Sequence, residues 1–190
     1  NFHVQLNYNS ENQWYFPTHG SRLKVEYAYI TDNFTQLDDK AGLSEVNANW
    51  RFSLPLSKRF TLRPMVYGRC LWGAKIPVIY GNSIGGEWFG HYLEQQMPFA
   101  GIGNMEFTDR HFMALQLEAQ QSIASSHFIL LRLAAAQHAE EFKHTFKQQT
   151  LLGYQLGYYY NTLLGPLGAT IGYSNKTKEV NFYINLGFEF

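Results

Sequence analysis

The strongest constraint on the fold is an alternation of apolar and polar residues with a period of two. Such alternation predicts β-strands, because successive side chains of a strand point to opposite faces. It is clearest near the end of the chain, where Val180, Phe182 and Ile184 alternate with Asn181 and Tyr183. Eight further segments alternate in the same way: 2–8, 23–29, 46–54, 62–70, 113–120, 129–135, 152–161 and 167–173. The sequence therefore predicts an all-β chain of about eight to ten antiparallel strands.

The distribution of charge between the two faces indicates what each face touches. No Asp, Glu, Lys or Arg falls on the apolar face of these segments. The opposite face carries Lys24, Glu26, Arg51, Arg63, Arg69, Glu118, Arg132 and Glu189. Placing Arg or Lys against lipid at the bilayer midplane costs about 2–4 kcal/mol, whereas a watery lumen accepts charge. The pattern predicts a transmembrane β-barrel with its apolar side in lipid.

A soluble sandwich or lipocalin-like barrel, with its apolar face inward, is the alternative. Its solvent face would be rich in Lys and Glu, whereas here the polar face is rich in Gly, Asn, Gln and Tyr. Tyr or Trp also recurs near the ends of the apolar faces, as in the aromatic girdles of membrane barrels. These observations favour lipid contact, and strand edges in hydrocarbon must then be paired by closure.

The connections alternate in length, as expected when one barrel end has tight turns and the other has long loops. The short connections are 57–58, 122–126 and 163–166, and the long ones are 31–45, 73–110 and 137–149. The connection at 9–21 is longer than its position predicts. We expect 73–110 to be an extracellular or lumen-inserted loop of a single domain spanning 1–190.

Composition excludes several other classes of function. Lys plus Arg equals Asp plus Glu, so the chain has no field that would attract nucleic acid. The lone Cys70 cannot pair within the chain, and Cys and His show no metal-binding spacing, so we expect no metal and no cofactor. The sequence begins at Asn1 without an initiator Met or a signal segment, which indicates a processed product or a piece of a longer protein.

Two features of the sequence suggest enzymatic activity. Gly81-Asn82-Ser83-Ile84-Gly85 matches the Gly-x-Ser-x-Gly pattern of a nucleophile elbow, but it falls in a loop of a β-rich chain. An outer-membrane phospholipase would need Ser83 activated by His91 or His111 at the membrane edge. A metal at His138, His144, Glu140 and Glu141 is less favoured than a solvated loop of mixed charge. We expect no catalysis by this chain.

Several motifs, in order along the chain, carry a resemblance to a known family. Residues 14–23 read Trp-Tyr-Phe-Pro-Thr-His-Gly-Ser-Arg-Leu, residues 165–168 read Gly-Pro-Leu-Gly, and residues 185–190 read Asn-Leu-Gly-Phe-Glu-Phe. The chain resembles the bacterial surface antigen family, the barrels of outer-membrane protein insertases and two-partner transporters. The resemblance implies the C-terminal half of a sixteen-stranded barrel in the bacterial outer membrane. It also implies that the barrel assembly machinery recognises a C-terminal signal formed by Asn185, Gly187, Phe188 and Phe190.

The long loop refines this resemblance. Gly85, Gly86, Phe89, Gly90 and His91 stand where the family's loop folds back into the lumen. The insertase pattern has an Arg-Gly-aromatic tip, whereas this loop is closer to barrels attached to patatin-like phospholipases. The resemblance then implies a membrane anchor or a translocation or assembly pore that follows an upstream patatin-like hydrolase. A simple porin-like channel is a further alternative.

Face alternation predicts a lumen network that holds this loop. Its members are Arg51, Arg63, Arg69, Glu118 and Arg132. The expected partners are outer-membrane lipid, lipopolysaccharide and the assembly machinery. Nine strands cannot close an even-stranded barrel, so we expect a fragment, a half-barrel completed by a second copy in a homo-oligomer, or one misassigned strand.

Overall fold

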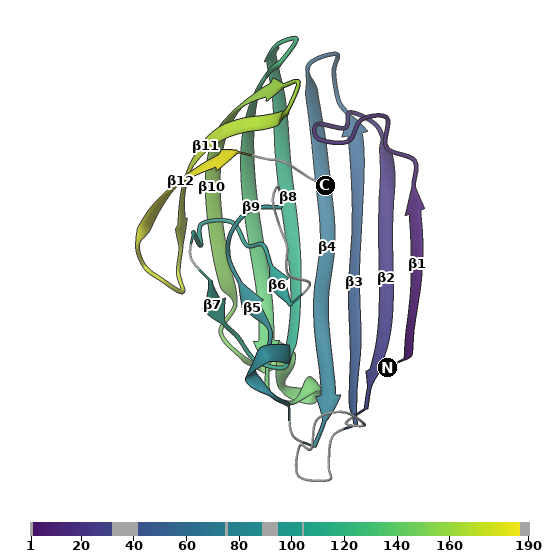
Figure 1. Cartoon of the computed structure of the whole chain (residues 1–190). Coiled ribbons are helices and arrows are strands. Elements are labelled where there is room, and N and C mark those ends of the chain that lie inside the picture. Colours follow the sequence, from purple (N-terminus) through teal and green to yellow (C-terminus); the bar gives the residue numbers. More distant parts are fainter. Residues whose placement is uncertain (1, 32–41, 75, 89–94, 104, 187–190) are drawn as a thin grey trace.

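The chain forms one large antiparallel sheet. A computed structural model describes residues 2–31, 42–74, 76–88, 95–103 and 105–186. Nine strands lie side by side in the order β1-β2-β3-β4-β8-β9-β10-β11-β12 and curl around a concave inner face (Figure 1). Their bounds are β1 Phe2–Asn9, β2 Gly20–Ile30, β3 Leu43–Pro55, β4 Phe60–Gly73, β8 His111–Ala124, β9 His127–Ala139, β10 Leu151–Thr162, β11 Gly165–Ser174 and β12 Val180–Leu186. The prediction of an all-β antiparallel chain is confirmed.

The two faces of the sheet divide as the alternation predicts. Cross-strand register places Arg63 beside Glu118 and Glu118 beside Arg132, all on the inner face. Every Asp, Glu, Lys and Arg of the nine strands occupies one of the alternate positions that face inward, which we call inward parity. The outer face carries large apolar side chains that are open to the surroundings, such as Leu115 (60% exposed) and Val66 (51%). A soluble sandwich would bury this surface, whereas a broad exposed apolar surface suits lipid.

The strands between the two edges are long enough to cross a membrane. β2 to β4 and β8 to β11 contain 10 to 14 residues each, and a tilted transmembrane strand needs about 9–11. β1 and β12 are the edges of the described sheet and are not paired with each other. Within the described residues, no helix is long and apolar enough to span a membrane.

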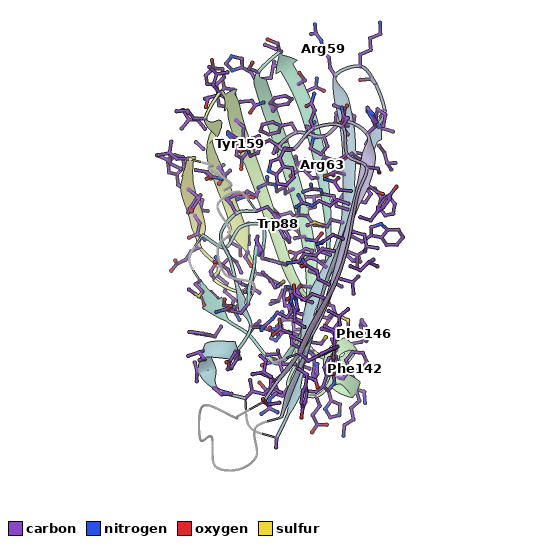
Figure 2. The ribbon with its side chains drawn as sticks, turned by 45° about the vertical axis from the view of Figure 1, so that its right-hand side comes forward. Arg59, Arg63, Trp88, Phe142, Phe146 and Tyr159 are labelled. Atoms are coloured by element: carbon purple, nitrogen blue, oxygen red, sulfur yellow. The ribbon has the colours of Figure 1, made fainter. Side chains whose placement is uncertain are left out.

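The connections separate into two ends. The turns β3–β4, β8–β9 and β10–β11 lie at what we call the short-turn end, and the loops β2–β3, β4–β8 and β9–β10 lie at the opposite, long-loop end. Figure 2 shows Arg59 at the short-turn end and Phe142 and Phe146 at the other. Several strands run beyond their predicted bounds, because their ladders continue past the alternating core. For example, Glu45 belongs to β3, and β9 runs to Ala139 before the 3-10 helix η2 (Phe142–Lys147).

The concave face is filled from both ends. The β4–β8 connection contributes Ile84, Met97 and Phe99 to an apolar cluster with Tyr67 and Phe112 of the sheet. The long β1–β2 connection turns inward as well. Its Phe16 is 1% exposed and stacks on Phe128 at a centroid distance of 4.1 Å. This packing explains the unexpected length of the connection, because it fills part of the concave side of the sheet, which we call the trough.

Candidate functional site: an interior loop bound to the strand wall

The β4–β8 connection is a compact unit with its own small sheet. After the 3-10 helix η1 (Val78–Tyr80), β5 (Ser83–Ile84) pairs with β6 (Gln96–Met97) and with β7 (Glu106–Phe107). Gly85 and Gly86 follow β5 with φ angles of 121° and 79°, in the region that favours glycine. Their backbone N–H groups donate to the carbonyls of Met97 and Ile102. The two glycines thus turn the chain so that the next residue reaches the wall.

That next residue, Glu87, is the principal contact between the loop and the sheet. It is 5% exposed and accepts hydrogen bonds from three neighbouring strands. Arg132 on β9 forms a short ion pair with Oε2, and Tyr159 on β10 donates to the same oxygen at 3.3 Å. Gln155 Nε2 and Thr170 Oγ1 donate to Oε1 at 2.6 and 3.2 Å. We call these five residues the Glu87 cluster; in it both carboxylate oxygens have charged or polar donors, as burial requires.

The Glu87 cluster continues toward β4 through a second carboxylate. Glu118 on β8 accepts from Arg132 Nε at 2.5 Å and forms a short ion pair with Arg63 on β4. Arg63 also donates to Gln120, whose amide reaches the Phe16 carbonyl at 3.4 Å. A continuous chain of polar contacts therefore links the loop, the wall and the inward-turned β1–β2 connection.

A separate set of contacts fixes the loop at the long-loop end. Arg69 holds both oxygens of Glu45 at 2.6 Å and donates to the Asn82 side chain at 2.7 Å. Asn82 is fully buried, and its amide donates to the carbonyls of Asp109 and Arg110 at 2.9 Å. These bonds secure the root of the loop and leave the Glu87 cluster to hold its inner part.

The expected single network of five residues needs correction. Arg63, Glu118 and Arg132 come together, whereas Arg69 pairs with Glu45 and Arg51 pairs with Glu11 at 2.5 Å. The physical reason is that each guanidinium takes the carboxylate nearest in register or in a connection. Glu11 lies in the β1–β2 connection, so Arg51 secures that segment instead of the long loop.

Glycines on β10 and β11 allow the loop backbone to lie directly on the sheet. A methyl group added at Gly153 would collide with the Ala100 carbonyl oxygen, and one at Gly172 would lie 2.7 Å from Gly101 Cα. On the opposite wall, Tyr67 donates to the Pro98 carbonyl at 2.6 Å. The loop is therefore bound to the wall by backbone proximity as well as by charge.

The remaining predicted residues are placed only in part. Gly85 and Gly86 form the turn before Glu87, whereas Phe89, Gly90 and His91 lie outside the described residues. Asn185 is 5% exposed on β12 and pairs in register with Gly168. Gly187, Phe188 and Phe190 of the expected C-terminal signal also lie outside the described residues, as does Glu189.

The geometry does not support an elbow-type hydrolase at Ser83. Ser83 belongs to β5, is 1% exposed and directs its hydroxyl to the Gln95 carbonyl at 3.4 Å. His111 instead has outward parity and packs between Trp72 and Phe142. An elbow requires a helix after the serine, and here two glycines with positive φ angles follow β5. The other proposed partner, His91, is outside the described residues.

His138 and His144 at the long-loop end lie beside carboxylates. His138 contacts Asp109 at 2.7 Å, and Glu140 contacts Arg110 at 2.9 Å. A hydrogen bond from Lys143 lowers the pKa of the exposed Glu141 carboxyl. Over the described ranges, no group of three or more His, Cys, Asp or Glu residues could hold a metal ion.

Sequence reasoning missed the acidic and amide partners of the site. Glu45 could have been found, because extending the alternation of 46–54 by one residue places it on the inward face with Arg51. Glu87 sits in a loop without periodicity, and only the preceding glycine pair indicated a turn there. Gln155 and Thr170 have inward parity, but nothing in the sequence distinguishes them from other polar lumen residues.

Comparison with known proteins identifies the family to which this fold belongs. No curated protein matches the chain. The sequence model of the OMP85 superfamily matches residues 1–190, the whole chain. Barrels of this superfamily are outer-membrane proteins of Gram-negative bacteria that serve in protein assembly and translocation. The curved sheet, its apolar outer face and its inward loop agree with this match, and the chain belongs to the OMP85 superfamily.

Proposed function

We propose that the chain is the C-terminal half of a sixteen-stranded outer-membrane barrel that acts as a membrane anchor and gated translocation pore. In this proposal the β4–β8 connection obstructs the lumen at rest, and the Glu87 cluster holds it there. The barrel follows an upstream patatin-like hydrolase. The lipid-facing partners are outer-membrane lipid and lipopolysaccharide, and the barrel assembly machinery inserts the chain.

The observation that carries the proposal is the ionic attachment of a long loop inside the trough. Apolar residues of the loop also pack on the sheet, and Glu87 adds a charged contact held by donors on β9, β10 and β11. Buried ion pairs contribute little net stability compared with well-packed apolar groups, although breaking one is costly. A polar attachment therefore suits a segment that must leave the wall when a passenger chain or a partner competes for its contacts.

The link to an upstream hydrolase rests on a different feature. The loop sequence, with Phe89-Gly90-His91 in place of an Arg-Gly-aromatic tip, favours barrels of the patatin-fusion type over insertases. The encoding gene tests this directly. A patatin-like hydrolase encoded before residue 1 supports the proposal, and periplasmic substrate-capturing repeats in its place would favour an insertase.

Single-channel recording of the full-length protein in a planar bilayer tests the gate. The wild type should be closed for most of the record, and Glu87→Ala should raise the open fraction several-fold, because Arg132 then lacks its loop partner. Glu106→Ala is the matched control. It removes a carboxylate from the same loop, at a position with no ion pair among the described residues, and should leave the record unchanged.

The same recording separates the gated pore from a simple porin. A porin would show steady conductance in the wild type, with no change on substitution of Glu87. Circular dichroism of each variant confirms that the barrel is folded, so that an unchanged open fraction in folded Glu87→Ala protein would refute the gating role.

A further inference from the structure

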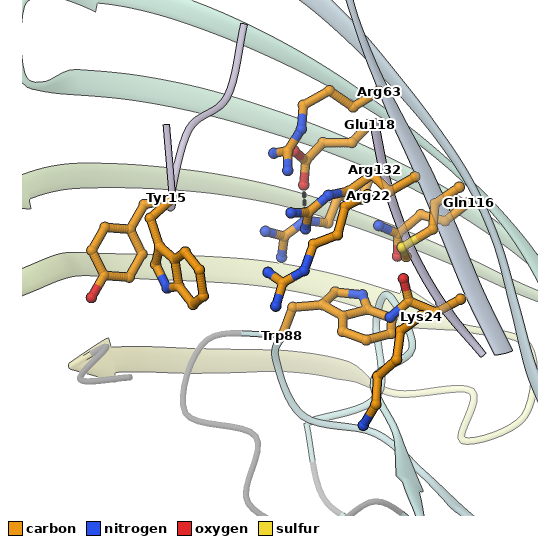
Figure 3. A pocket seen from close by; sticks show the side chains of 12 residues that line it. Tyr15, Arg22, Lys24, Arg63, Trp88, Gln116, Glu118 and Arg132 are labelled. Carbon is orange, nitrogen blue, oxygen red and sulfur yellow. Dashed lines mark hydrogen bonds and ion pairs between the residues drawn. The ribbon is translucent and has the colours of Figure 1, made fainter. Parts of the chain in front are cut away.

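A cavity remains on the concave face beside the bound loop. It measures about 190 Å³ and lies between the inner wall of β2, β3 and β4, the loop residue Trp88 and the β1–β2 connection. Figure 3 shows Arg22, Lys24 and Arg63 extending from the strands into this space, with Trp88 among them and Tyr15 on the opposite side.

The cavity carries an excess of positive charge. Five cationic side chains line it: Arg22, Lys24, Arg51, Arg63 and Arg132. Four of them are matched by carboxylates. Lys24 contacts Glu26 at 3.2 Å, Arg51 contacts Glu11, and Arg63 and Arg132 are served by Glu118 and Glu87. Lys24, Arg51, Arg63 and Arg132 thus have carboxylate partners. Among the described residues, Arg22 is the cation of this cavity without a carboxylate partner.

Arg22 is held in place by an aromatic ring. Its guanidinium lies over the Trp14 ring with Cζ 4.8 Å from the centroid, and it makes no ion pair with any described residue. A cation–π contact uses the face of the guanidinium and leaves its edge N–H groups available. Directly across the sheet, Arg22 pairs in register with Arg51, so two Arg side chains leave facing positions of the cavity wall. Like charges at facing positions are unfavourable, and among the described residues Glu11 forms its ion pair with Arg51 alone.

Volume and wall chemistry limit the ligand. A space of 190 Å³ corresponds to about six water molecules at about 30 Å³ each, which is too small for a lipid chain or a folded segment. Guanidinium edges recognise carboxylate and phosphate oxygens, and the aromatic walls suit a flat apolar group. We infer that this cavity, with Arg22 as its main anchor, binds a small organic oxyanion: a phosphomonoester or carboxylate that carries an apolar group. This site goes beyond the proposed function and holds whether the barrel serves as an anchor or as a pore.

Calorimetric titration of the full-length protein in nonionic detergent with phenyl phosphate tests the inference. We expect saturable binding to one site. Arg22→Gln should raise the dissociation constant about tenfold or more, because a charge-assisted hydrogen-bond pair is lost. Arg22→Lys, which keeps the charge but loses the fork geometry, should give an intermediate value. Phenol, which lacks the oxyanion, should not bind.

Arg59→Gln is the matched control, because it removes one positive charge at the exposed short-turn end. It should bind phenyl phosphate as the wild type does. Trp14→Leu provides a second variant, and loss of the ring that holds Arg22 should weaken binding several-fold. Circular dichroism verifies the fold of each variant. The inference is overturned if the wild type shows no saturable binding up to millimolar phenyl phosphate, if phenol binds equally well, or if Arg59→Gln weakens binding as much as Arg22→Gln.

The titration also identifies the source of the oxyanion. In phosphatidylcholine vesicles the protein should bind phenyl phosphate as it does in detergent. If added phosphatidic acid, a lipid with a phosphomonoester headgroup, abolishes this binding in proportion to its content, a lipid headgroup occupies the site. If it has no effect while inorganic phosphate competes, the ligand is a soluble phosphate compound. Both results retain the site, and they differ only in its occupant.

Discussion

The two halves of the concave face are built differently. From β4 to β11 the wall is covered: the loop backbone touches it at Ala100 and Gly101, and Arg132 is 4% exposed. On β2 and β3 the wall borders the cavity, where Lys24 and Arg51 keep 31% and 18% of their side chains exposed. The covered half carries glycines with inward parity on β10 and β11, and the cavity half carries long cations instead.

This difference indicates that the loop lies where inward-facing strand positions are glycines. A segment can approach a sheet closely only where the facing residues lack a Cβ, and the polar groups that it buries there must all find partners. On the cavity half, the charged side chains stay partly exposed to solvent, which tolerates incomplete pairing. Changes in the covered half should therefore cost several kcal/mol, and changes in the cavity half should cost little.

The largest loss of stability is expected for Arg132→Ala. It leaves Glu87 without a cationic partner in a buried site and removes one of the two partners of Glu118. Breaking a buried ion pair from one side costs about 3–5 kcal/mol. Urea unfolding in detergent micelles measures this loss, with the exposed Arg59→Ala as control. A cost below about 1 kcal/mol would mean that the covered half is not held by charge.

Phe16→Ala should have the next largest effect. Phe16 is the apolar contact that the β1–β2 connection makes with β9 and β10, stacked on Phe128 and tilted against Tyr159. Removing a buried phenyl ring costs about 3 kcal/mol or more through lost burial and the remaining void. The same urea titration applies, and Leu164→Ala in an exposed turn should change the midpoint little. Equal effects of the two changes would show that the connection is not anchored in the trough.

The strand wall was predictable from the sequence to a much greater extent than the binding of the loop. Lipid excludes charge from every second position, so alternation alone places all nine strands and predicts that Arg63, Glu118 and Arg132 share a face. The partners of these residues come from segments without periodicity. Glu87 reaches Arg132 only because Gly85 and Gly86 turn the loop, and Glu11 reaches Arg51 only because its connection folds inward. Those contacts depend on tertiary packing, which no local pattern encodes.

Gly153→Ala tests whether the missing side chains position the loop. The new methyl group would collide with the Ala100 carbonyl oxygen, so the loop must move away from β10. Overpacking of this kind costs about 1–3 kcal/mol. Limited proteolysis should then cut the β4–β8 connection faster than in the wild type. Gly103→Ala is the matched control, because its methyl group would meet only the Asn181 side chain at 3.4 Å. Equal cleavage rates in both variants would show that the close approach at Gly153 does not determine the position of the loop.

The smallest effect is expected for Arg22→Gln in the cavity half. The substitution removes a cation–π contact with Trp14, which is worth about 0.5–1 kcal/mol at a solvated site. It also relieves the repulsion from Arg51, which pairs with Arg22 in register. These two terms oppose each other, so the free energy of unfolding should change by less than about 1 kcal/mol. If Arg22→Gln proved as destabilising in urea as Arg132→Ala, the cavity half would be a structural wall like the covered half. A near-neutral result would show that Arg22 is not needed for the stability of the wall, so that a loss of phenyl phosphate binding in Arg22→Gln could be attributed to the site itself.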